Sequence, residues 1–250
     1  MMKKLILILI LLGLAVPAAS LAAGPSVKVD KADIDVTNQA SLQRGAKYFV
    51  NYCLGCHQAQ YSRYARVGQD LGLTEDQVRD NLIFTRDEQG DPTRVGDLMK
   101  NAFPEADAEE AFHVVPPDLT LVARARGEDW LYTFLRSFYL DKDRPFGVNN
   151  TVFSNVGMPH VLWDLQGWQE KVTETDARGN EVTRLELAES GSLSRAEYDA
   201  VVRDIVTFLS YMGEPIQHER KMLGIWVMLF LGLFTVLAYL LKKEYWKDIH

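Results

Sequence analysis

The pentapeptide Cys53-Leu54-Gly55-Cys56-His57 constrains the fold of this chain more than any other feature. Two cysteines separated by two residues and followed at once by a histidine have the spacing of a c-type haem attachment site. The two sulfurs become thioethers to the two vinyl groups of one porphyrin, and the short loop places the next imidazole beneath the iron. The motif occurs once, so the chain is expected to fold around one covalently bound haem c.

Other uses of two cysteines fit the sequence less well. A structural disulfide would leave His57 unexplained, and a zinc site would need two further ligands at local spacing, whereas the remaining histidines are scattered. A thioredoxin-like dithiol follows a strand in a βαβ unit, but the residues ahead of this motif predict a helix. An exported thiol oxidoreductase is kept as the non-haem alternative. Cys53 and Cys56 are the only cysteines, which excludes a framework of several disulfides.

Residues 1–23 have the organisation of a secretory signal peptide. Lys3 and Lys4 form a positive start, residues 5–16 are apolar or glycine, and small residues follow, with cleavage expected near Ala22 or Ala23. Twelve such residues reach roughly 18 Å as a helix, which is less than the ~30 Å hydrocarbon core of a bilayer. Residues 24–219 are therefore expected to form an exported domain.

A second apolar run, residues 222–241, predicts a membrane anchor. It contains no charge, and as a helix it spans roughly 30 Å, the thickness of the hydrocarbon core. Trp226 lies near one end, and Tyr245 and Trp246 lie just beyond the other, as interfacial aromatic residues do. We expect a single transmembrane helix over residues 220–243. Because the preceding domain is exported, residues 244–250 are expected to form a cytoplasmic tail.

The charge of the exported domain differs from that of the whole chain. Seven of the 27 basic residues but only two of the 34 acidic residues lie outside residues 24–219, so the domain carries a net charge of −12 against −7 for the chain. This sign argues against nucleic acid as a partner, because phosphate binding needs a basic surface. An acidic surface instead attracts a basic partner over long range.

Capping signals and apolar periodicity predict a mostly α fold. Helices are expected after Asn38, after the capping box Thr74–Gln77 and over residues 128–140. Another begins at the Ser194 capping box and runs to Met212, before Pro215 interrupts it. Between residues 140 and 192, Gly, Asn, Pro and Thr are frequent, which predicts long loops or a short hairpin, with residues 182–187 as a short strand.

A haem iron bound by His57 needs a second axial ligand. Met158 lies in a loop between Gly157 and Pro159, where a rigid turn can direct one side chain at a fixed target, and His113 and His160 are the rival ligands. The other internal methionines of the mature chain are Met99, Met212, Met222 and Met228, of which the last two lie in the predicted span and Met212 on an apolar helix stripe, where packing is the usual role. A haem iron bound by a His/Met pair has a higher reduction potential than one bound by a His/His pair.

The segment around Pro117 is a candidate partner for His57. A ligating histidine usually donates its second ring N–H to a backbone carbonyl or a carboxylate, which fixes its tautomer. The carbonyl of Pro117 is the candidate acceptor, and a plain loop proline is the alternative interpretation.

Several separated motifs, in this order and ahead of a C-terminal anchor, resemble the cytochrome c1 family, the haem subunits of ubiquinol–cytochrome c oxidoreductase (bc1) complexes. Besides the haem motif, these are Arg44-Gly45 with Tyr48, Pro116-Pro117-Asp118-Leu119, residues 124–130, Gly157-Met158-Pro159, residues 206–209, and Glu214-Pro215 with His218. The resemblance covers nearly the whole mature chain and implies a class I cytochrome c-like haem domain with long loops.

The resemblance also implies the place of the protein in electron transfer. It implies a single-pass protein of the bacterial inner membrane, with the haem domain in the periplasm and cytochrome b beside the anchor. Electrons would come from the Rieske iron–sulfur protein and pass to a basic soluble or anchored cytochrome c. The complex, and not this chain alone, would be the enzyme. A haem c subunit of a terminal oxidase or of a nitric oxide reductase is the alternative.

The resemblance further implies roles for single residues. Met158 would be the sixth ligand, and Arg126 would pair with a haem propionate, with Arg124 as the alternative and a water-facing arginine as the ordinary role. Trp130 stands where the family has a tyrosine, near the haem edge. Two acidic clusters are candidates for docking the basic cytochrome c: Asp87, Glu88 and Asp91, and Glu105, Asp107, Glu109 and Glu110.

Overall fold

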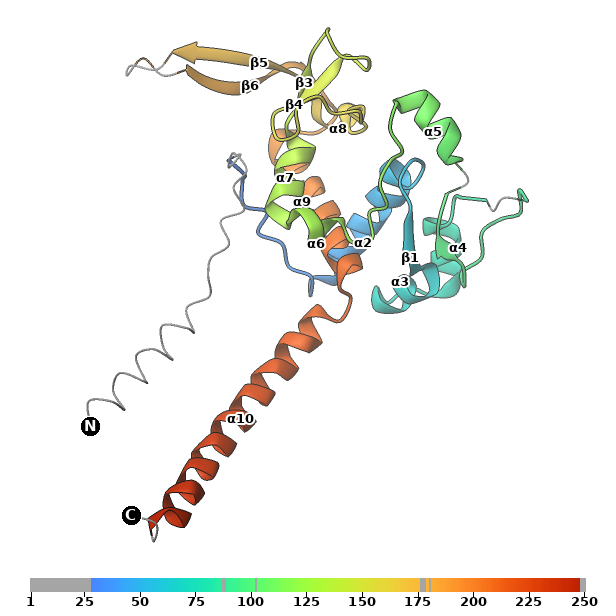
Figure 1. The fold of residues 1–250 in the computed structure, drawn as a ribbon. Coiled ribbons are helices and arrows are strands. Elements are labelled where there is room, and N and C mark those ends of the chain that lie inside the picture. The colour runs from blue at the N-terminus through green and yellow to red at the C-terminus, as the bar shows by residue number, and fades with distance from the viewer. Residues whose placement is uncertain (1–27, 87–88, 102, 176–178, 180, 248–250) are drawn as a thin grey trace.

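The computed structural model describes residues 28–86, 89–101, 103–175, 179 and 181–247. The predicted signal peptide, residues 1–23, and the acidic pair Asp87 and Glu88 lie outside the described residues. Figure 1 shows a mostly helical body from which one long helix leaves. The predicted fold class, mostly α with an apolar helix at the C-terminus, is confirmed.

The described helices and strands alternate along the chain with long loops. The helices are α2 (Gln39–Tyr48), the π-helical turn η1 (Phe49–Cys53), α3 (Tyr64–Asp70), α4 (Glu75–Leu82), α5 (Glu105–Phe112), α6 (Val122–Arg126), α7 (Glu128–Arg136), α8 (Trp163–Gln166), α9 (Arg195–Gly213) and α10 (Gln217–Tyr245). The strands form three antiparallel pairs: β1 (Ala59–Arg63) with β2 (Leu98–Met99), β3 (Phe138–Leu140) with β4 (Val148–Asn150), and β5 (Gly167–Thr175) with β6 (Glu181–Ser190).

Three predicted helix starts are confirmed by their caps. The Asn38 side chain accepts a hydrogen bond from the backbone of Ser41 at the start of α2. Thr74 and Ser194 each form a complete capping box, with Gln77 on α4 and Glu197 on α9. These contacts are local, and they satisfy the N–H groups that a helix end leaves without partners.

The core forms where α2 and η1 pack against α9. The rings of Phe49 and Phe208, both fully buried, have centroids 5.5 Å apart. The buried Asp204 carboxylate of α9 accepts hydrogen bonds from Ser41 Oγ at 2.6 Å and from Arg44 Nε at 2.6 Å on α2. This packing fixes the segment that leads into the Cys53–His57 motif.

The helix predicted over residues 128–140 is wrong at its C-terminal end. Helix α7 ends at Arg136, and Phe138–Leu140 form strand β3. The physical reason is a non-local partner: β3 pairs with β4, and the Asn150 side-chain amide donates to the last-turn carbonyl of Phe134 at 2.8 Å. Aromatic residues suit such a pleated strand.

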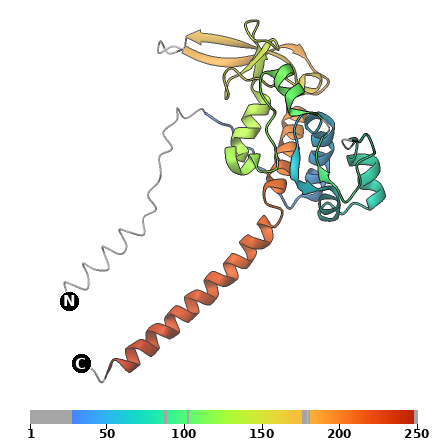
Figure 2. The ribbon, with the colours of Figure 1, turned by 45° about the vertical axis from the view of Figure 1, so that its right-hand side comes forward.

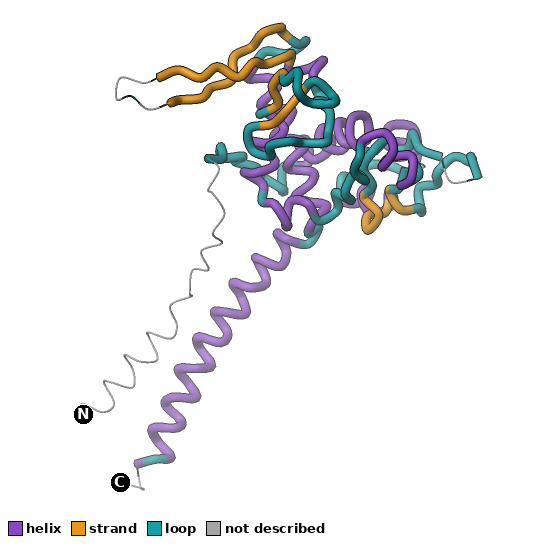
Figure 3. The backbone as a smooth tube through the Cα atoms, turned by 45° about the horizontal axis from the view of Figure 1, so that its top comes forward, coloured by secondary structure: helices purple, strands orange, loops and turns teal. Residues whose placement is uncertain are grey.

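The region predicted as loops or a short hairpin contains both, together with the short helix α8. The predicted strand 182–187 lies within the longer strand β6, which pairs with β5. This β5–β6 hairpin extends from the side of the body opposite to α10 (Figures 1 and 3).

Helix α10 leaves the body after a three-residue link, residues 214–216. No residue of α10 is buried, and the helix is long and apolar enough to cross a membrane. Figure 2 shows it extending from the body without packing on another described element. It contains the whole apolar run of residues 222–241.

Candidate haem site

The two cysteines lie at the end of η1 and in the turn that follows. The backbone N–H groups of Cys56 and His57 both donate to the carbonyl of Cys53, at 3.1 and 2.8 Å, so the motif closes into a compact loop. Asn101 Nδ2 donates to the carbonyl of Leu54 at 3.0 Å and holds this loop from outside. Cys53 is buried, Cys56 is exposed, and they are not joined in a disulfide.

The environment of the cysteines disfavours thiol–disulfide chemistry. Burial raises the pKa of Cys53 to about 12, and burial also raises the pKa of Cys56. A dithiol oxidoreductase needs the opposite, because its reactive species is a thiolate formed at lowered pKa. The motif also follows the helical elements α2 and η1 and not a strand.

His57 is held by the loop that contains Pro117. Its Nδ1 lies 2.8 Å from the Pro117 carbonyl oxygen, so Nδ1–H is the donor tautomer and Nε2 is left with a lone pair. Burial lowers the pKa of His57, which favours the neutral imidazole that a metal requires. The Leu119 N–H donates to Gln58 O, and the Asp118 carboxylate accepts from the Gln60 N–H, both at 2.8 Å. These bonds fix the Pro117 loop beside the motif.

The Met158 loop packs on the segment that leads into Pro117. A Cβ atom on Gly157 would lie 3.0 Å from Val114 Cγ1, three residues before Pro117. Met158 is half-buried against the core. Residues 114–117 therefore contact the histidine of the motif on one side and adjoin the methionine loop on the other.

The rival ligands have other surroundings. His160 is buried, and its ring stacks on Phe138 with centroids 4.9 Å apart and meets Trp168 edge-on at 5.8 Å. Burial lowers the pKa of His160 to about 4. His113 is exposed in a left-handed conformation at the end of α5. Met99 and Met212 are buried in the core, as packing residues are.

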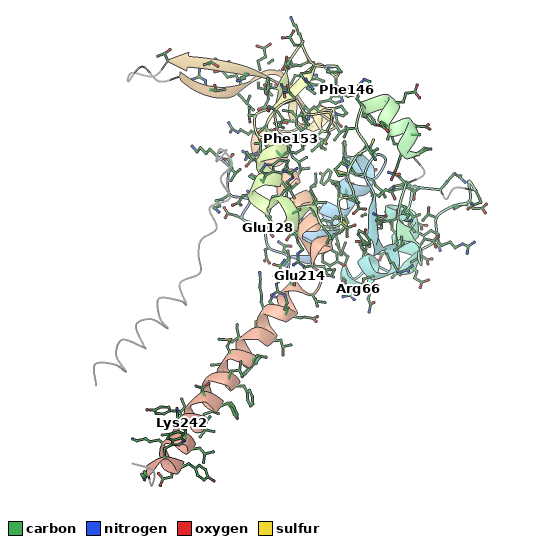
Figure 4. All side chains as sticks on the ribbon, in the orientation of Figure 1. Arg66, Glu128, Phe146, Phe153, Glu214 and Lys242 are labelled. Carbon is green, nitrogen blue, oxygen red and sulfur yellow. The ribbon has the colours of Figure 1, made fainter. Side chains whose placement is uncertain are left out.

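The two arginines of α6 face different surroundings. The Arg126 guanidinium lies 5.2 Å from the Trp130 ring and 5.8 Å from the Phe153 ring, and the Trp130 ring is half-buried and stacks on Phe134. Arg124 instead lies 3.7 Å from the carboxylate of Glu214. Figure 4 shows Phe153 beside α7, on the side of the body away from α10.

Comparison with known proteins shows the family of the chain. The family model described as the Cytochrome C1 family matches residues 31–249. The chain belongs to the cytochrome c1 family. It is 56% identical to the cytochrome c1 of Allochromatium vinosum over the full length of both chains, and 28% identical to that of Rhodospirillum rubrum over 85% of this chain and 83% of the relative. It is also 48% identical to the ammonia monooxygenase gamma subunit of Nitrosomonas europaea, over all of this chain and 99% of that one.

Cytochromes c1 carry a covalently bound haem c, so the predicted cofactor is confirmed. The residues of this chain fit such a group. The site offers two thiols, a neutral imidazole with one nitrogen engaged, and a thioether in a neighbouring loop. Apolar side chains remain accessible on the segments that we assign to the site: Val114 is 48% exposed and Val115 38%, just before Pro117, and Phe153 is 43% exposed beside Arg126. A porphyrin needs such apolar surface to cover it.

Sequence reasoning missed the roles of three residues in this region, of which only Asp118 was named, as part of a family motif. Asn101 and Asp118 hold the motif loop and the Pro117 loop, and Phe153 lies against Arg126. Asp118 follows two prolines, and it also accepts a hydrogen bond from the Thr120 N–H two residues on, a turn pattern that the sequence could have indicated. Asn101 and Phe153 act across long separations and give no local signal.

Proposed function

We propose that this cytochrome c1 carries single electrons from a Rieske iron–sulfur protein to a periplasmic cytochrome c within a quinol-oxidising bc1 complex. The observation that carries the proposal is the loop Cys53–His57 with His57 Nδ1 bonded to the Pro117 carbonyl. This bond orients the imidazole and leaves Nε2 for a metal. The chain alone supplies no acid–base chemistry and is not an enzyme; the assembled complex is.

Each site residue then has a defined role. Cys53 and Cys56 would hold the haem through two thioether bonds, and His57 and Met158 would supply the nitrogen and sulfur donors to its iron. The bound haem supplies a one-electron couple, whose potential is raised by a His/Met pair. Pro117 fixes the tautomer of His57.

On α6 and α7, Arg126 would pair with a haem propionate, and Trp130 would cover the haem edge. The cation–π contact between these two side chains positions the guanidinium.

The two apolar segments support a placement in the membrane. Residues 1–23 direct export and are removed, the haem domain of residues 24–219 lies in the periplasm, residues 220–243 anchor it in the inner membrane, and residues 244–250 stay in the cytoplasm. Cytochrome b lies beside α10. The carboxylates of Glu105, Asp107, Glu109 and Glu110 are exposed on α5 and attract a basic cytochrome c.

Purification through a C-terminal tag tests the assembly. We expect a haem-stained band for this chain on a denaturing gel, together with two b haems and a Rieske cluster in the same complex. Quinol-dependent reduction of the c haem should stop when the Rieske subunit is removed. Co-purification with a terminal oxidase, a nitric oxide reductase or a monooxygenase, without b haems and Rieske cluster, would refute the proposal.

The axial ligand is tested separately by Met158→Leu. Loss of the thioether should open the sixth position, so the reduced variant should bind carbon monoxide rapidly and its potential should fall. Met212→Leu is the matched control, because it removes the same thioether from a methionine that is buried in α9 as a packing residue. Rapid carbon monoxide binding by the unmodified reduced protein would refute the His57/Met158 assignment.

A further inference from the structure

The junction between the body and the membrane helix is short and structured. Helix α9 ends at Gly213 and α10 begins at Gln217, so the link is Glu214, Pro215 and Ile216. The Glu214 N–H donates to the carbonyl of Tyr211 at 3.1 Å, and its own carbonyl accepts from the Gln217 N–H at 3.1 Å. Backbone hydrogen bonds therefore tie the link both to the end of α9 and to the start of α10.

The Glu214 carboxylate joins three helices at this junction. It accepts hydrogen bonds from both Nε and Nη2 of Arg220 on α10, the second at 3.1 Å. Arg124 Nη1 of α6 lies 3.7 Å from the same carboxylate. The Glu214 side chain is only 16% exposed. The hydrogen bond from Arg220, and to a smaller extent the charge of Arg124, hold the pKa of Glu214 below its ordinary value. Figure 4 shows Glu214 at the point where α10 leaves the body.

Close packing on α6 reinforces the contact. A Cβ atom on Gly213 would lie 3.2 Å from Arg124 Cγ, so the end of α9 rests on the arginine stem. Two residues along the same short helix, the Arg126 guanidinium lies over the Trp130 ring. Helix α6 thus connects the anchor junction to the Arg126–Trp130 pair, to which the proposed function assigns the haem propionate and the haem edge.

We propose that Glu214 is a positioning residue that fixes the direction of the anchor helix relative to the haem domain. By bridging Arg124 and Arg220, it holds the haem at one orientation to the membrane plane, so that donor and acceptor meet it at constant geometry. Bidentate arginine–carboxylate pairs have the directional geometry that this role needs. The consequence for electron transfer rests on the proposed function; the bridge itself does not.

The test compares Glu214→Gln, Glu214→Asp and the control Glu219→Gln in the full chain embedded in lipid nanodiscs. Glu219→Gln also removes one negative charge, from the first turn of α10, but it leaves the Arg124–Glu214–Arg220 bridge intact. Hydrogen exchange of the amides in residues 214–220 should become about tenfold faster in Glu214→Gln, because local opening costs less without the bridge. Glu214→Asp should restore part of the protection, and Glu219→Gln should match the unmodified chain.

Electron paramagnetic resonance of the oxidised haem in oriented membrane layers gives the second readout. Glu214→Gln should broaden the distribution of haem angles to the membrane, with haem content and thermal unfolding of the domain close to those of the control. A distribution as narrow as that of the unmodified chain, or unchanged exchange at residues 214–220, would overturn the proposal. A chain without covalent haem would refute the proposed function, and hydrogen exchange would still decide the role of Glu214.

Discussion

Replacing Gly45 by alanine tests the helix contact that supports the haem motif. A Cβ atom at this position would lie 2.1 Å from the carbonyl oxygen of Asp204 and 2.7 Å from the Cβ of Phe208, whereas ordinary contacts between carbon atoms are about 3.5–4.0 Å. The obstacle is backbone of α9, and the Asp204 side chain is itself held by Ser41 and Arg44. Helix α2 must therefore move away from α9.

Two opposing effects set the size of the change. Alanine favours the helix over glycine by about 0.5–1 kcal/mol. Overpacking of a close-packed core costs about 1–3 kcal/mol, and the upper end applies because a backbone atom cannot swing aside. We expect a net loss of about 2 kcal/mol, which lowers the melting temperature by roughly 4–8 °C for a domain of this size.

Thermal unfolding of the full chain in detergent, followed by circular dichroism, measures this loss for Gly45→Ala. Gly96→Ala is the matched control, because a Cβ atom there meets no atom within 4 Å. If Gly45→Ala melts at or above the temperature of the unmodified chain, helix propensity outweighs the clash and the inferred α2–α9 contact does not limit stability.

Three further substitutions test other parts of the domain. Asp204→Ala leaves the buried Ser41 hydroxyl without its acceptor and should lower the free energy of unfolding by about 2–3 kcal/mol in urea titrations; a loss below that of an average surface substitution would contradict the buried network. Ser194→Ala removes the N-cap of α9 and should cost about 1 kcal/mol, with faster hydrogen exchange confined to the first turn of that helix. The hydrogen bond from Lys31 lowers the pKa of Asp129 in the folded chain. The ionised Asp129 therefore stabilises the folded state fully above the ordinary pKa of 3.8, and this stabilisation is lost as the pH falls through the lower pKa of the folded state. The difference in stability between the unmodified chain and Asp129→Asn should therefore shrink in acid, and a difference that grows in acid would refute the assignment.

Local signals account for the features that the sequence predicted well. The capping boxes at Thr74 and Ser194 each lie within four residues, and the haem motif lies within five. The C-terminal end of α7 was mispredicted because apolar spacing continues through Phe138 while the chain has already left the helix. Phe138–Leu140 pair with Val148–Asn150, and this partner strand lies outside residues 128–140.

Gly45 shows a different limit of sequence reasoning. A glycine inside a helix lowers the expected helix stability, and its spacing relative to Leu42 and Ala46 says nothing about the need for it. The need arises from Asp204, 159 positions later, whose carbonyl occupies the place of a Cβ atom. The lower helix propensity of Gly45 is visible in the local sequence, whereas the contact that requires a glycine is made with a distant residue, so one sequence does not show why the glycine is there.

The division between Arg124 and Arg126 is the clearest case in which structure separates two residues that sequence leaves equivalent. Both side chains are exposed and lie two positions apart on α6. From the sequence alone, either could be assigned to a haem propionate. Arg124 already has an acidic partner in Glu214, so moving it to a propionate would leave that carboxylate with Arg220 alone. Arg126 contacts only aromatic faces among its described ring and ion-pair partners, and these leave its charge available to an anion. One short helix thus holds one cation against Glu214 at the start of α10 and leaves the other for the propionate that we propose as its partner.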